Sequence, residues 1–442
     1  MSCLKKYSNI YSMIIDHDED SIALTYDDDK TITSIYYGEL EEKIISYPIN
    51  SDALMVGIIC DNTIDTIIAI LAYLYYKKTI VLLSAKEKIE ALQEKIDRVG
   101  IDYIEGPDRI KKDLRPSTNK YEPLDYKIIF FTATKAVILT EEKLCLSAYN
   151  GSLLMPLKPN DELYSCLPLN YVYGFVCSWL WAWQNGASII LNRGTKELFN
   201  DFKYFRPTVV ALVPQLASAF LLRNSFNREL RFILLGGGDC TEATLKALYD
   251  KGIRFSYGYG LTETSSGVAM SMGINPRAFK VCPMDDIILD DDDEILIKCD
   301  KLIFDGYYPD NSSYNESFTE DGYFKTGDLG YFDDDHNLHL KGRKKDLLVL
   351  PDGSKILLNV EEKKIMDLIH IKELAIGLNN NAEVTLCLGK TSKEDLSFIK
   401  EEIVKYNEDV IREHRITKII TTIDPLPKDQ NGKIKRFEIN YN

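Results

Sequence analysis

Residues 53–60 read Ala-Leu-Met-Val-Gly-Ile-Ile-Cys, an unbroken apolar run of the length of one buried β-strand. Asp61 and Asn62 follow, and their side chains can cap a helix that extends through the apolar residues 64–76. Residues 79–83 form the next apolar run. A strand, a helix and a second strand in succession predict a βαβ unit with two parallel strands.

The same alternation continues on the C-terminal side of this unit. Because crossover helices cover the faces of a parallel sheet, we predict an α/β fold with a mostly parallel sheet and helices on both faces. Further strands are predicted at residues 103–104, 127–132, 187–191, 209–213 and 232–235, and further helices at residues 84–99, after Thr140 and at residues 214–223.

About two thirds of the way along the chain the pattern changes from βα units to short alternating strands. Residues 287–289 and 294–298 surround the acidic turn 290–293, which predicts a hairpin. A charged stretch and a small α/β tail follow. We therefore expect two domains, residues 1–344 and residues 345–442.

Composition describes a globular chain and argues against some functions. The 442 residues are 45% hydrophobic, and a formal charge of −15 argues against a nucleic-acid partner. Nine scattered cysteines, with no metal-ligand spacing, suit the reduced thiols of a cytoplasm. The N-terminus lacks the apolar stretch of a signal peptide, and residues 64–76 are too few to cross a bilayer, so we expect a cytoplasmic protein with no membrane span.

The segment Tyr257-Gly-Tyr-Gly-Leu-Thr-Glu-Thr264 follows a strand-like run and holds the first candidate site. Its glycines allow a ligand to approach the backbone closely, and a tyrosine offers a flat face for stacking. Glu263 can bind a hard cation such as Mg²⁺. The alternative is a glycine-rich turn with a solvated glutamate.

Four further motifs accompany this segment. Gly236-Gly237-Gly238-Asp239 ends a predicted strand, where ligands of parallel sheets bind. The carboxylate of Thr326-Gly327-Asp328 suits the two hydroxyls of a ribose, although a turn-capping aspartate is the common alternative. Downstream, Gly342-Arg343-Lys344-Lys345-Asp346 supplies a guanidinium for phosphate or ribose oxygens. The tail, residues 427–436, contains Gly432-Lys433, either a phosphate-binding point charge or part of a solvated basic tail.

In this order and spacing, the motifs resemble the core motifs of the adenylate-forming superfamily, which includes acyl-CoA synthetases, peptide-synthetase adenylation domains and luciferases. The resemblance extends from about Ile64 to Arg436. It implies a large N-terminal domain of βα units with mixed sheets and a small β-barrel-like part, followed by a small α+β lid domain that rotates between two half-reactions. It also implies that ATP and Mg²⁺ activate a carboxylic acid as its acyl-AMP, and that CoA then accepts the acyl group as a thioester.

The resemblance implies a role for each motif residue on the adenosine side of the nucleotide. Tyr259 would stack on the adenine, and Asp328 would hold the ribose hydroxyls with help from Arg343. The other face of the adenine would contact Gly237, Gly238 and Asp239.

On the phosphate side, the resemblance implies that Thr262 contacts the α-phosphate and Glu263 binds Mg²⁺. Lys433 would bridge the carboxylate and the α-phosphate as charge develops, which is an electrostatic task. Lys345 would be the hinge residue of the lid.

The segment that corresponds to the family's phosphate-binding loop is shortened. In the family this loop is rich in threonine, serine and glycine, whereas residues 131–137 read Phe-Thr-Ala-Thr-Lys-Ala-Val, without glycine. Backbone N–H groups form the anion-binding nest of such loops, and the nest is harder to form without glycines. Thr132, Thr134 and Lys135 remain as candidate contacts to the β,γ-phosphates. We expect reduced ATP affinity.

Residues 168–174, Pro-Leu-Asn-Tyr-Val-Tyr-Gly, match a substrate-side motif of the family, with Tyr171 where histidine is usual and Gly174 in place. No aspartate stands there to hold an α-amine, so we expect a small-molecule carboxylate that is not an amino acid. Residues 234–238 and the short chain resemble o-succinylbenzoate-CoA ligases. Two alternatives stay open: a ligase that loads the phosphopantetheine of an acyl-carrier protein, and a weakly active or non-catalytic member that binds a nucleotide or acyl-AMP.

Overall fold

The computed structural model describes residues 4–299, 301–371, 373–392, 396–428 and 434–442. The chain forms two compact units. Unit 1 consists of Met1–Ile288, Leu296–Thr326 and Phe332–His339, and unit 2 of Leu289–Ile295, Gly327–Tyr331 and Leu340–Asn442. Two short segments from the N-terminal part of the chain therefore belong to unit 2, and the single domain boundary between residues 344 and 345 stays a prediction.

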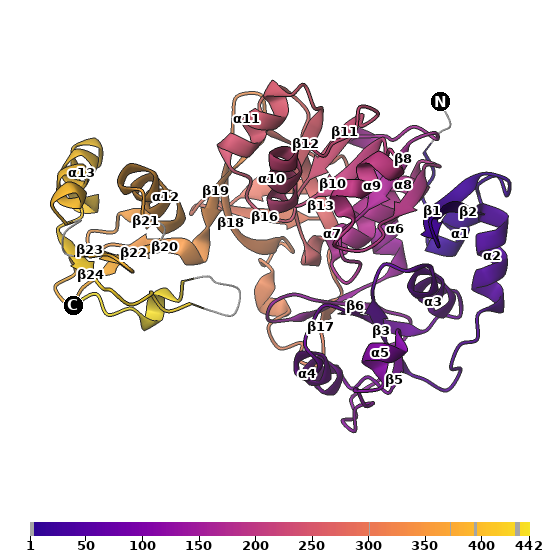
Figure 1. Ribbon diagram of the computed structural model, residues 1–442. Helices are drawn as coiled ribbons and strands as arrows, with labels where there is room; N and C mark the ends of the chain where they lie inside the picture. The colour runs from indigo at the N-terminus through magenta and orange to yellow at the C-terminus, as the bar shows by residue number, and fades with distance from the viewer. Residues whose placement is uncertain (1–3, 300, 372, 393–395, 429–433) are drawn as a thin grey trace. The chain divides into compact units, whose positions relative to one another are not determined.

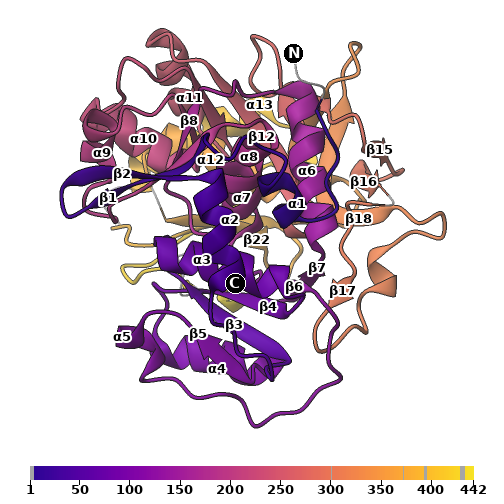
Figure 2. The same ribbon diagram turned by 90° about the vertical axis from the view of Figure 1, so that its right-hand side faces the viewer.

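The first sheet of unit 1 contains the βαβ unit that opens the sequence. Its strand order is β17-β7-β6-β4-β3-β5, and Figure 2 shows β3, β4, β6, β7 and β17 in this succession. Every residue of β3 and β4 is buried, as their apolar runs predict. Four strands are parallel, namely β3 (Met55–Cys60), β4 (Thr79–Ser84), β5 (Tyr103–Glu105) and β6 (Ile128–Phe131), whereas β7 (Ala136–Leu139) and β17 (Gly306–Tyr307) are antiparallel to their neighbours.

The second sheet of unit 1 is parallel in its centre and antiparallel at its ends. The strands of this sheet that lie wholly within unit 1 have the order β14-β13-β12-β11-β10-β8-β9-β1-β2, and β15 (Asp286–Leu289) is divided between the two units. The helices α10 (Pro214–Arg223) and α11 (Glu242–Asp250) pack against each other beside β10, β11 and β12 (Figure 1). The strands are β1 (Ile22–Asp28), β2 (Thr31–Tyr36), β8 (Glu162–Ser165), β9 (Ser188–Leu191), β10 (Val209–Leu212), β11 (Phe232–Leu235), β12 (Phe255–Leu261), β13 (Ser266–Ser271) and β14 (Phe279–Val281).

The helices of unit 1 pack on both sheets through their apolar faces. The side chains of all three tryptophans, Trp179, Trp181 and Trp183, are buried and belong to the core of unit 1. The remaining helices are α1 (Ile10–Ile14), α2 (Tyr37–Ser46), α3 (Ile64–Tyr75), α4 (Ile89–Val99), α5 (Asp108–Lys111), α6 (Glu141–Leu154), α7 (Val172–Phe175), α8 (Trp181–Gln184) and α9 (Leu198–Tyr204), with a π-helical segment η1 at Val176–Leu180. Within the described ranges, no helix combines the length and the apolar character needed to span a bilayer.

Unit 2 has a core of its own between two helices and a three-stranded sheet. The helices are α12 (Leu358–Ile369) and α13 (Leu396–Asp409), and the sheet consists of β22 (Leu374–Leu378), β23 (Val384–Leu388) and β24 (Lys418–Thr421). A hairpin of β20 (Leu347–Val349) and β21 (Lys355–Leu357) precedes them. The residues of β16 (Glu294–Lys298), β18 (Phe324–Phe332) and β19 (Leu338–Arg343) are divided between the two units.

The expected fold class is confirmed: a mixed α/β chain with a large multi-sheet N-terminal part and a smaller C-terminal part. The barrel-like part stays a prediction. Two local predictions are wrong. Thr63, rather than Asp61 or Asn62, caps α3, because its side chain accepts a hydrogen bond from the Thr66 N–H, while Asp61 accepts the Thr63 hydroxyl. The helix predicted from residue 84 begins at Ile89, because residue 84 still belongs to β4.

Candidate active site

The tyrosine- and glycine-rich motif lies inside a strand, not in the turn that its glycines indicate. Residues 257–261 belong to β12, and only Thr262–Thr264 form a 3₁₀ turn. A side-chain carbon on Gly260 would lie 1.9 Å from the Ser266 carbonyl oxygen, so the pairing with β13 requires glycine there. Tyr259 is buried, with 8% of its surface exposed.

Tyr257 connects this strand to the glycine-rich segment that follows β11. Its hydroxyl donates to the Gly238 carbonyl oxygen at 2.7 Å and accepts from the Cys240 N–H at 3.1 Å. Burial raises the pKa of Tyr257 to about 12, so the hydroxyl keeps its proton at neutral pH. Gly237 has a φ of +74°, which favours glycine. Asp239 is exposed and forms an ion pair with Arg277 at 3.2 Å.

The substrate-side motif packs against the same glycines. The Tyr173 hydroxyl donates to the Leu234 carbonyl oxygen at 2.9 Å, and a side-chain carbon on Gly236 would lie 2.9 Å from the Tyr173 ring. Gly174 approaches Pro168 so closely that a side-chain carbon would lie 2.2 Å from its carbonyl oxygen. Tyr171, in contrast, is 54% exposed and precedes α7.

A cation, an aromatic ring and a carboxylate meet where β17 pairs with β7. The Tyr307 hydroxyl donates to Glu263 Oε1 at 3.3 Å, and the Phe304 N–H donates to the Glu263 carbonyl oxygen at 2.8 Å. The Lys135 ammonium lies 3.7 Å from the centre of the Tyr307 ring. Burial, followed by the charge of Glu263, raises the pKa of Tyr307, so its hydroxyl remains a donor. We refer to Lys135, Tyr307 and Glu263 as the phosphate-side cluster.

The phosphate-side cluster suits a magnesium ion that arrives with a nucleotide. Magnesium usually binds one or two protein carboxylates together with substrate phosphates and waters. Glu263 is one such carboxylate, and its side chain is only partly exposed. Across the described residues no group of three or more His, Cys, Asp or Glu side chains could hold a metal by itself. The residues therefore fit a shared metal better than a resident one.

Residues 132–135, which the sequence predicts to be a shortened phosphate loop, form a tight turn between β6 and β7. The Thr132 N–H donates to the Lys135 carbonyl oxygen at 2.8 Å, and the Lys135 N–H donates to the Thr132 hydroxyl at 3.0 Å. Arg98 donates to the Thr134 carbonyl oxygen at 2.7 Å. Two of the turn's four N–H groups are thus used within the turn, while the Lys135 ammonium extends to Ser313 at 3.0 Å.

Unit 2 contains the two residues that the sequence predicts to bind the ribose. Asp328 and Arg343 form an ion pair of 2.6 Å, and Asp328 is buried. Asp328 lies within β18, so the expected tight turn is wrong, although Gly327 has a φ of +69°. The buried Glu294 accepts the Gly327 N–H at 2.9 Å and the Lys344 ammonium at 2.6 Å. Glu294 thereby holds together the neighbours of Asp328 and Arg343.

The predicted hinge and the C-terminal motif also lie in unit 2. Lys345 is exposed in the 3₁₀ turn Lys344–Asp346. Asp346 accepts from Arg436 at 3.2 Å, and Arg436 also donates to the buried Glu362 at 3.0 Å. Lys433 lies outside the described residues. The residues on either side of its segment, Lys428 and Ile434, pair as an antiparallel bridge.

Sequence reasoning missed three residues of this arrangement. Tyr307 and Glu294 were not predicted as site residues, because they are adjacent to the motif residues in space only. Tyr173 lies within the motif 168–174 but was not singled out there. For Tyr307 the sequence signal was the preceding Gly306, since a glycine in a strand often marks a close approach of backbone. The side-chain roles predicted for the motif residues stay predictions.

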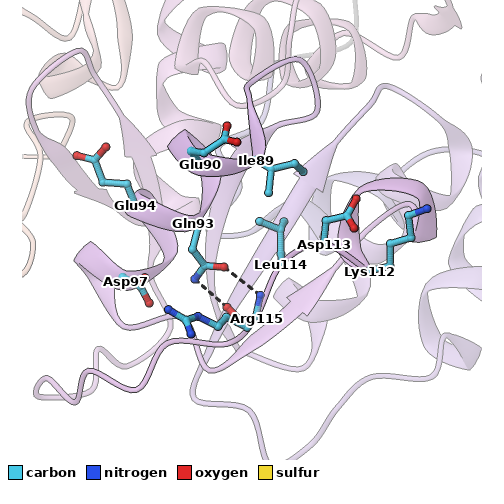
Figure 3. Close-up of a pocket in the computed structure, with 9 residues that line it drawn as sticks. All are labelled: Ile89, Glu90, Gln93, Glu94, Asp97, Lys112, Asp113, Leu114 and Arg115. Carbon is cyan, nitrogen blue, oxygen red and sulfur yellow. Dashed lines mark hydrogen bonds between the residues drawn. The ribbon is translucent and has the colours of Figure 1, made fainter.

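One surface hollow is lined by none of the predicted site residues. It measures about 630 Å³ and lies between α4 and residues 112–115 (Figure 3). The Gln93 side chain reaches across to the main chain of Arg115, donating at 3.1 Å and accepting at 3.0 Å (Figure 3). Its charged lining residues (Glu90, Glu94, Asp97, Lys112, Asp113 and Arg115) include none of the predicted site residues.

Comparisons with known proteins agree with the motif series. Residues 132–295 match the family model of AMP-binding enzymes. A 2-succinylbenzoate--CoA ligase of Bacillus cereus (strain AH820) is 23% identical over 325 residues, which are 69% of this chain and 66% of that protein. A 2-succinylbenzoate--CoA ligase of Listeria monocytogenes serotype 4b (strain F2365) is 30% identical over 224 residues, 49% of this chain and 46% of that protein. In sequence, the chain thus aligns with less than two thirds of the length of these relatives.

The solved structures extend the likeness over nearly the whole chain. The O-succinylbenzoate coenzyme A synthetase of Bacillus subtilis, in complex with AMP, superposes with a TM-score of 0.77 at 18% sequence identity, covering 98% of each chain. This likeness shows that the two proteins share a fold. The family match of residues 132–295, the similar relatives and the shared fold agree with the resemblance of the ordered motifs to the adenylate-forming superfamily of AMP-binding enzymes.

Proposed function

We propose that the protein activates a carboxylic acid without an amino group as its acyl-AMP, using ATP and Mg²⁺, and then transfers the acyl group to CoA. The observation that carries this proposal is the phosphate-side cluster. A lysine, a tyrosine hydroxyl and a carboxylate from three separate segments meet there, as a polyphosphate bound with a divalent cation requires. The match of residues 132–295 to the family model of AMP-binding enzymes and the names of the relatives support the reaction class.

In the first half-reaction, a substrate carboxylate oxygen attacks the α-phosphorus of ATP, and pyrophosphate leaves. Glu263 would hold Mg²⁺, which neutralises phosphate charge when bound. Lys135 would stabilise the departing pyrophosphate, and Thr262 would contact the α-phosphate. Tyr259 would stack on the adenine, in contact with the backbone of Gly237 and Gly238.

In the second half-reaction, the CoA thiol loses its proton and its sulfur attacks the acyl carbonyl carbon, so that AMP leaves. Asp328 and Arg343 would hold the ribose through both steps, and Lys433 would act in the first step only. Rotation of a C-terminal domain at Lys345 would separate the two steps. Each of these assignments is part of the proposal.

CoA is the acceptor that we propose. The relatives and the similar solved structure are named for CoA, and they supply no support for an acyl-carrier protein. We also propose a cytoplasmic location, because no disulfide joins the cysteines of the described ranges.

The decisive experiment measures acid-dependent ATP–pyrophosphate exchange over a panel of carboxylic acids, followed by CoA thioester formation. We expect exchange with at least one acid, and thioester only when CoA is added. Lys433→Ala should lower the adenylation rate about a hundredfold or more, as for loss of an oxyanion donor, but should largely spare thioester formation from supplied acyl-AMP. An equal loss in both steps would contradict the role of Lys433.

One observation favours a second candidate, a protein that binds AMP or acyl-AMP without efficient adenylation. The Thr132 and Lys135 N–H groups are hydrogen-bonded within the turn, so they cannot also contribute to a phosphate nest. Binding of AMP without exchange for any acid would favour this candidate over the ligase.

A further inference from the structure

A small cavity lies inside unit 1, away from the surface hollow of Figure 3. It measures about 40 Å³ and is bounded by α6, η1, α8, β11 and β13. Its walls are mostly apolar, with Met155, Val176, Trp181, Leu234 and Met270 among them. We refer to it as the inner cavity.

No residue of the segments 168–174, 236–239 or 257–264 lines the inner cavity, but residues close to each of them in sequence do. Leu234 lies two residues before Gly236, and its carbonyl oxygen accepts the Tyr173 hydroxyl. Ser266 follows the 3₁₀ turn of Glu263, and its carbonyl oxygen accepts the Thr264 hydroxyl at 2.9 Å. Cys177, three residues after Gly174, contacts the Ser266 hydroxyl at 3.6 Å. A group in this cavity would therefore lie between the adenine-side and substrate-side motifs.

The walls suit an uncharged group. The polar side chains in the lining are Ser147, Cys177 and Ser266, and none of the lining residues is charged. Burial raises the pKa of the Cys177 thiol to about 12, so it stays neutral. A second carboxylate placed here would lose its hydration without gaining a cation, which is costly.

The size of the inner cavity excludes an aromatic ring. A cavity that holds benzene in a protein core measures about 150 Å³, nearly four times the volume available here. A chain of a few methylene groups fits the smaller space. The relatives, in contrast, are named for 2-succinylbenzoate, an aromatic acid with a second carboxylate.

A glycine in the last turn of α6 supports this reading independently. Gly151 is a wall of the inner cavity, although glycine inside a helix costs about 1 kcal/mol relative to alanine. Steric conflict does not explain it, because a side-chain carbon there would meet only the Met270 methyl, at 3.7 Å. An alanine at position 151 would instead fill part of the inner cavity.

Building on the proposed function, we infer that the inner cavity binds the acyl chain of a short aliphatic monocarboxylic acid. The protein would therefore reject aryl acids and dicarboxylic acids. Propionate and butyrate represent the accepted class. Benzoate and 2-succinylbenzoate represent the rejected class.

The test uses non-reactive acyl-sulfamoyl adenosines, so that binding is measured independently of catalysis. Calorimetry should give the propionyl analogue a Kd at least about tenfold lower than that of the benzoyl analogue, the discrimination expected when a hydrophobic pocket is too small. Exchange assays with the four free acids should follow the same order.

Two variants test the cavity itself. Gly151→Ala should lower affinity for the butyryl analogue about tenfold while the thermal midpoint stays equal or rises, since alanine favours a helix. Gly273→Ala is the matched control, because no atom lies within 4 Å of the added carbon. It should change neither the affinity for the butyryl analogue nor the thermal midpoint. Met270→Ala should improve binding of the benzoyl analogue.

The results separate the two proposals. Equal or tighter binding of the benzoyl analogue, or binding of neither analogue, overturns the inference. A propionyl preference without exchange for any acid supports the inference and contradicts the proposed ligase activity.

Discussion

Replacing Glu141 with glutamine should stabilise unit 1 above neutral pH and have little effect in acid. Glu141 is the first residue of α6 and is 4% exposed. Its Oε1 accepts the Ile10 N–H at 3.0 Å, whereas no described group bonds to Oε2. Burial raises the pKa of this carboxyl from 4.5 to about 7. Glutamine keeps the oxygen that faces Ile10 and removes the charge.

The sign follows from proton binding. The folded state holds the Glu141 proton between pH 4.5 and 7, while the unfolded state releases it. The carboxyl's contribution to stability is therefore fully present below pH 4.5 and is lost as the pH rises through 7. A shift of this size corresponds to about 3 kcal/mol in total, most of which develops between pH 5 and pH 8. Glu141→Gln has no such loss.

The measurement is urea unfolding followed by tryptophan fluorescence at several pH values. All three tryptophans (Trp179, Trp181 and Trp183) lie buried in unit 1, so the signal reports this unit alone. The free energy of unfolding of Glu141→Gln minus that of the parent should grow by about 2 to 3 kcal/mol from pH 5 to pH 8. Asp285, another buried carboxyl whose pKa is raised to about 7, is present in both proteins and cancels.

The control is Glu142→Gln, the next residue of α6. The Glu142 side chain is 51% exposed, and its nearest charged partner, Lys301, lies at 3.8 Å. The free energy of unfolding of this variant minus that of the parent should not increase with pH. If the free energy of unfolding of Glu141→Gln minus that of the parent stayed constant between pH 5 and pH 8, or decreased, burial would be refuted as the cause.

Three further predictions concern the nucleotide. Glu294→Gln should raise the KM for ATP about fivefold. The amide oxygen can still accept the Gly327 N–H, but the variant loses the ion pair with Lys344. Because this lysine is half-exposed, the ion pair is worth about 1 kcal/mol. Asp292→Asn, which breaks an exposed pair, should leave the KM unchanged. Lys345→Pro should keep adenylation and abolish thioester formation by restricting φ, and unchanged rates in both steps would place the hinge elsewhere. AMP should stabilise the protein against heat more than Mg-ATP at equal concentration, by about 1.4 kcal/mol for a tenfold affinity gap, and an equal or tighter Kd for Mg-ATP would contradict this.

Much of the fold could be predicted because its strands carry their own signal. Residues 53–60 and 79–83 are apolar throughout, and the corresponding β3 and β4 are buried at every position. In contrast, β7 was not predicted as a strand. It pairs with β6, its neighbour in sequence, and with β17, which comes from a distant part of the chain. For the motif residues 257–261 the sequence left two readings open, a ligand-binding segment after a strand and a glycine-rich turn, and β13 supplies the partner that makes them a strand.

For the site, the sequence by itself determined which chemical groups are present and in what order: a tyrosine and a glutamate, an aspartate, an arginine and a lysine in the motif series of the adenylate-forming superfamily. Only the tertiary structure decided which other residues join them. Tyr307 lies beside both Lys135 and Glu263 because β17 pairs with β7. The size of the inner cavity also depends on tertiary packing, since its walls come from three helical segments and two strands. Motif residues can be identified in sequence because chemistry limits the residue types that bind a nucleotide. Residues that are neighbours only in space cannot be identified in this way, because long-range packing sets their contacts and many residue types can satisfy that packing.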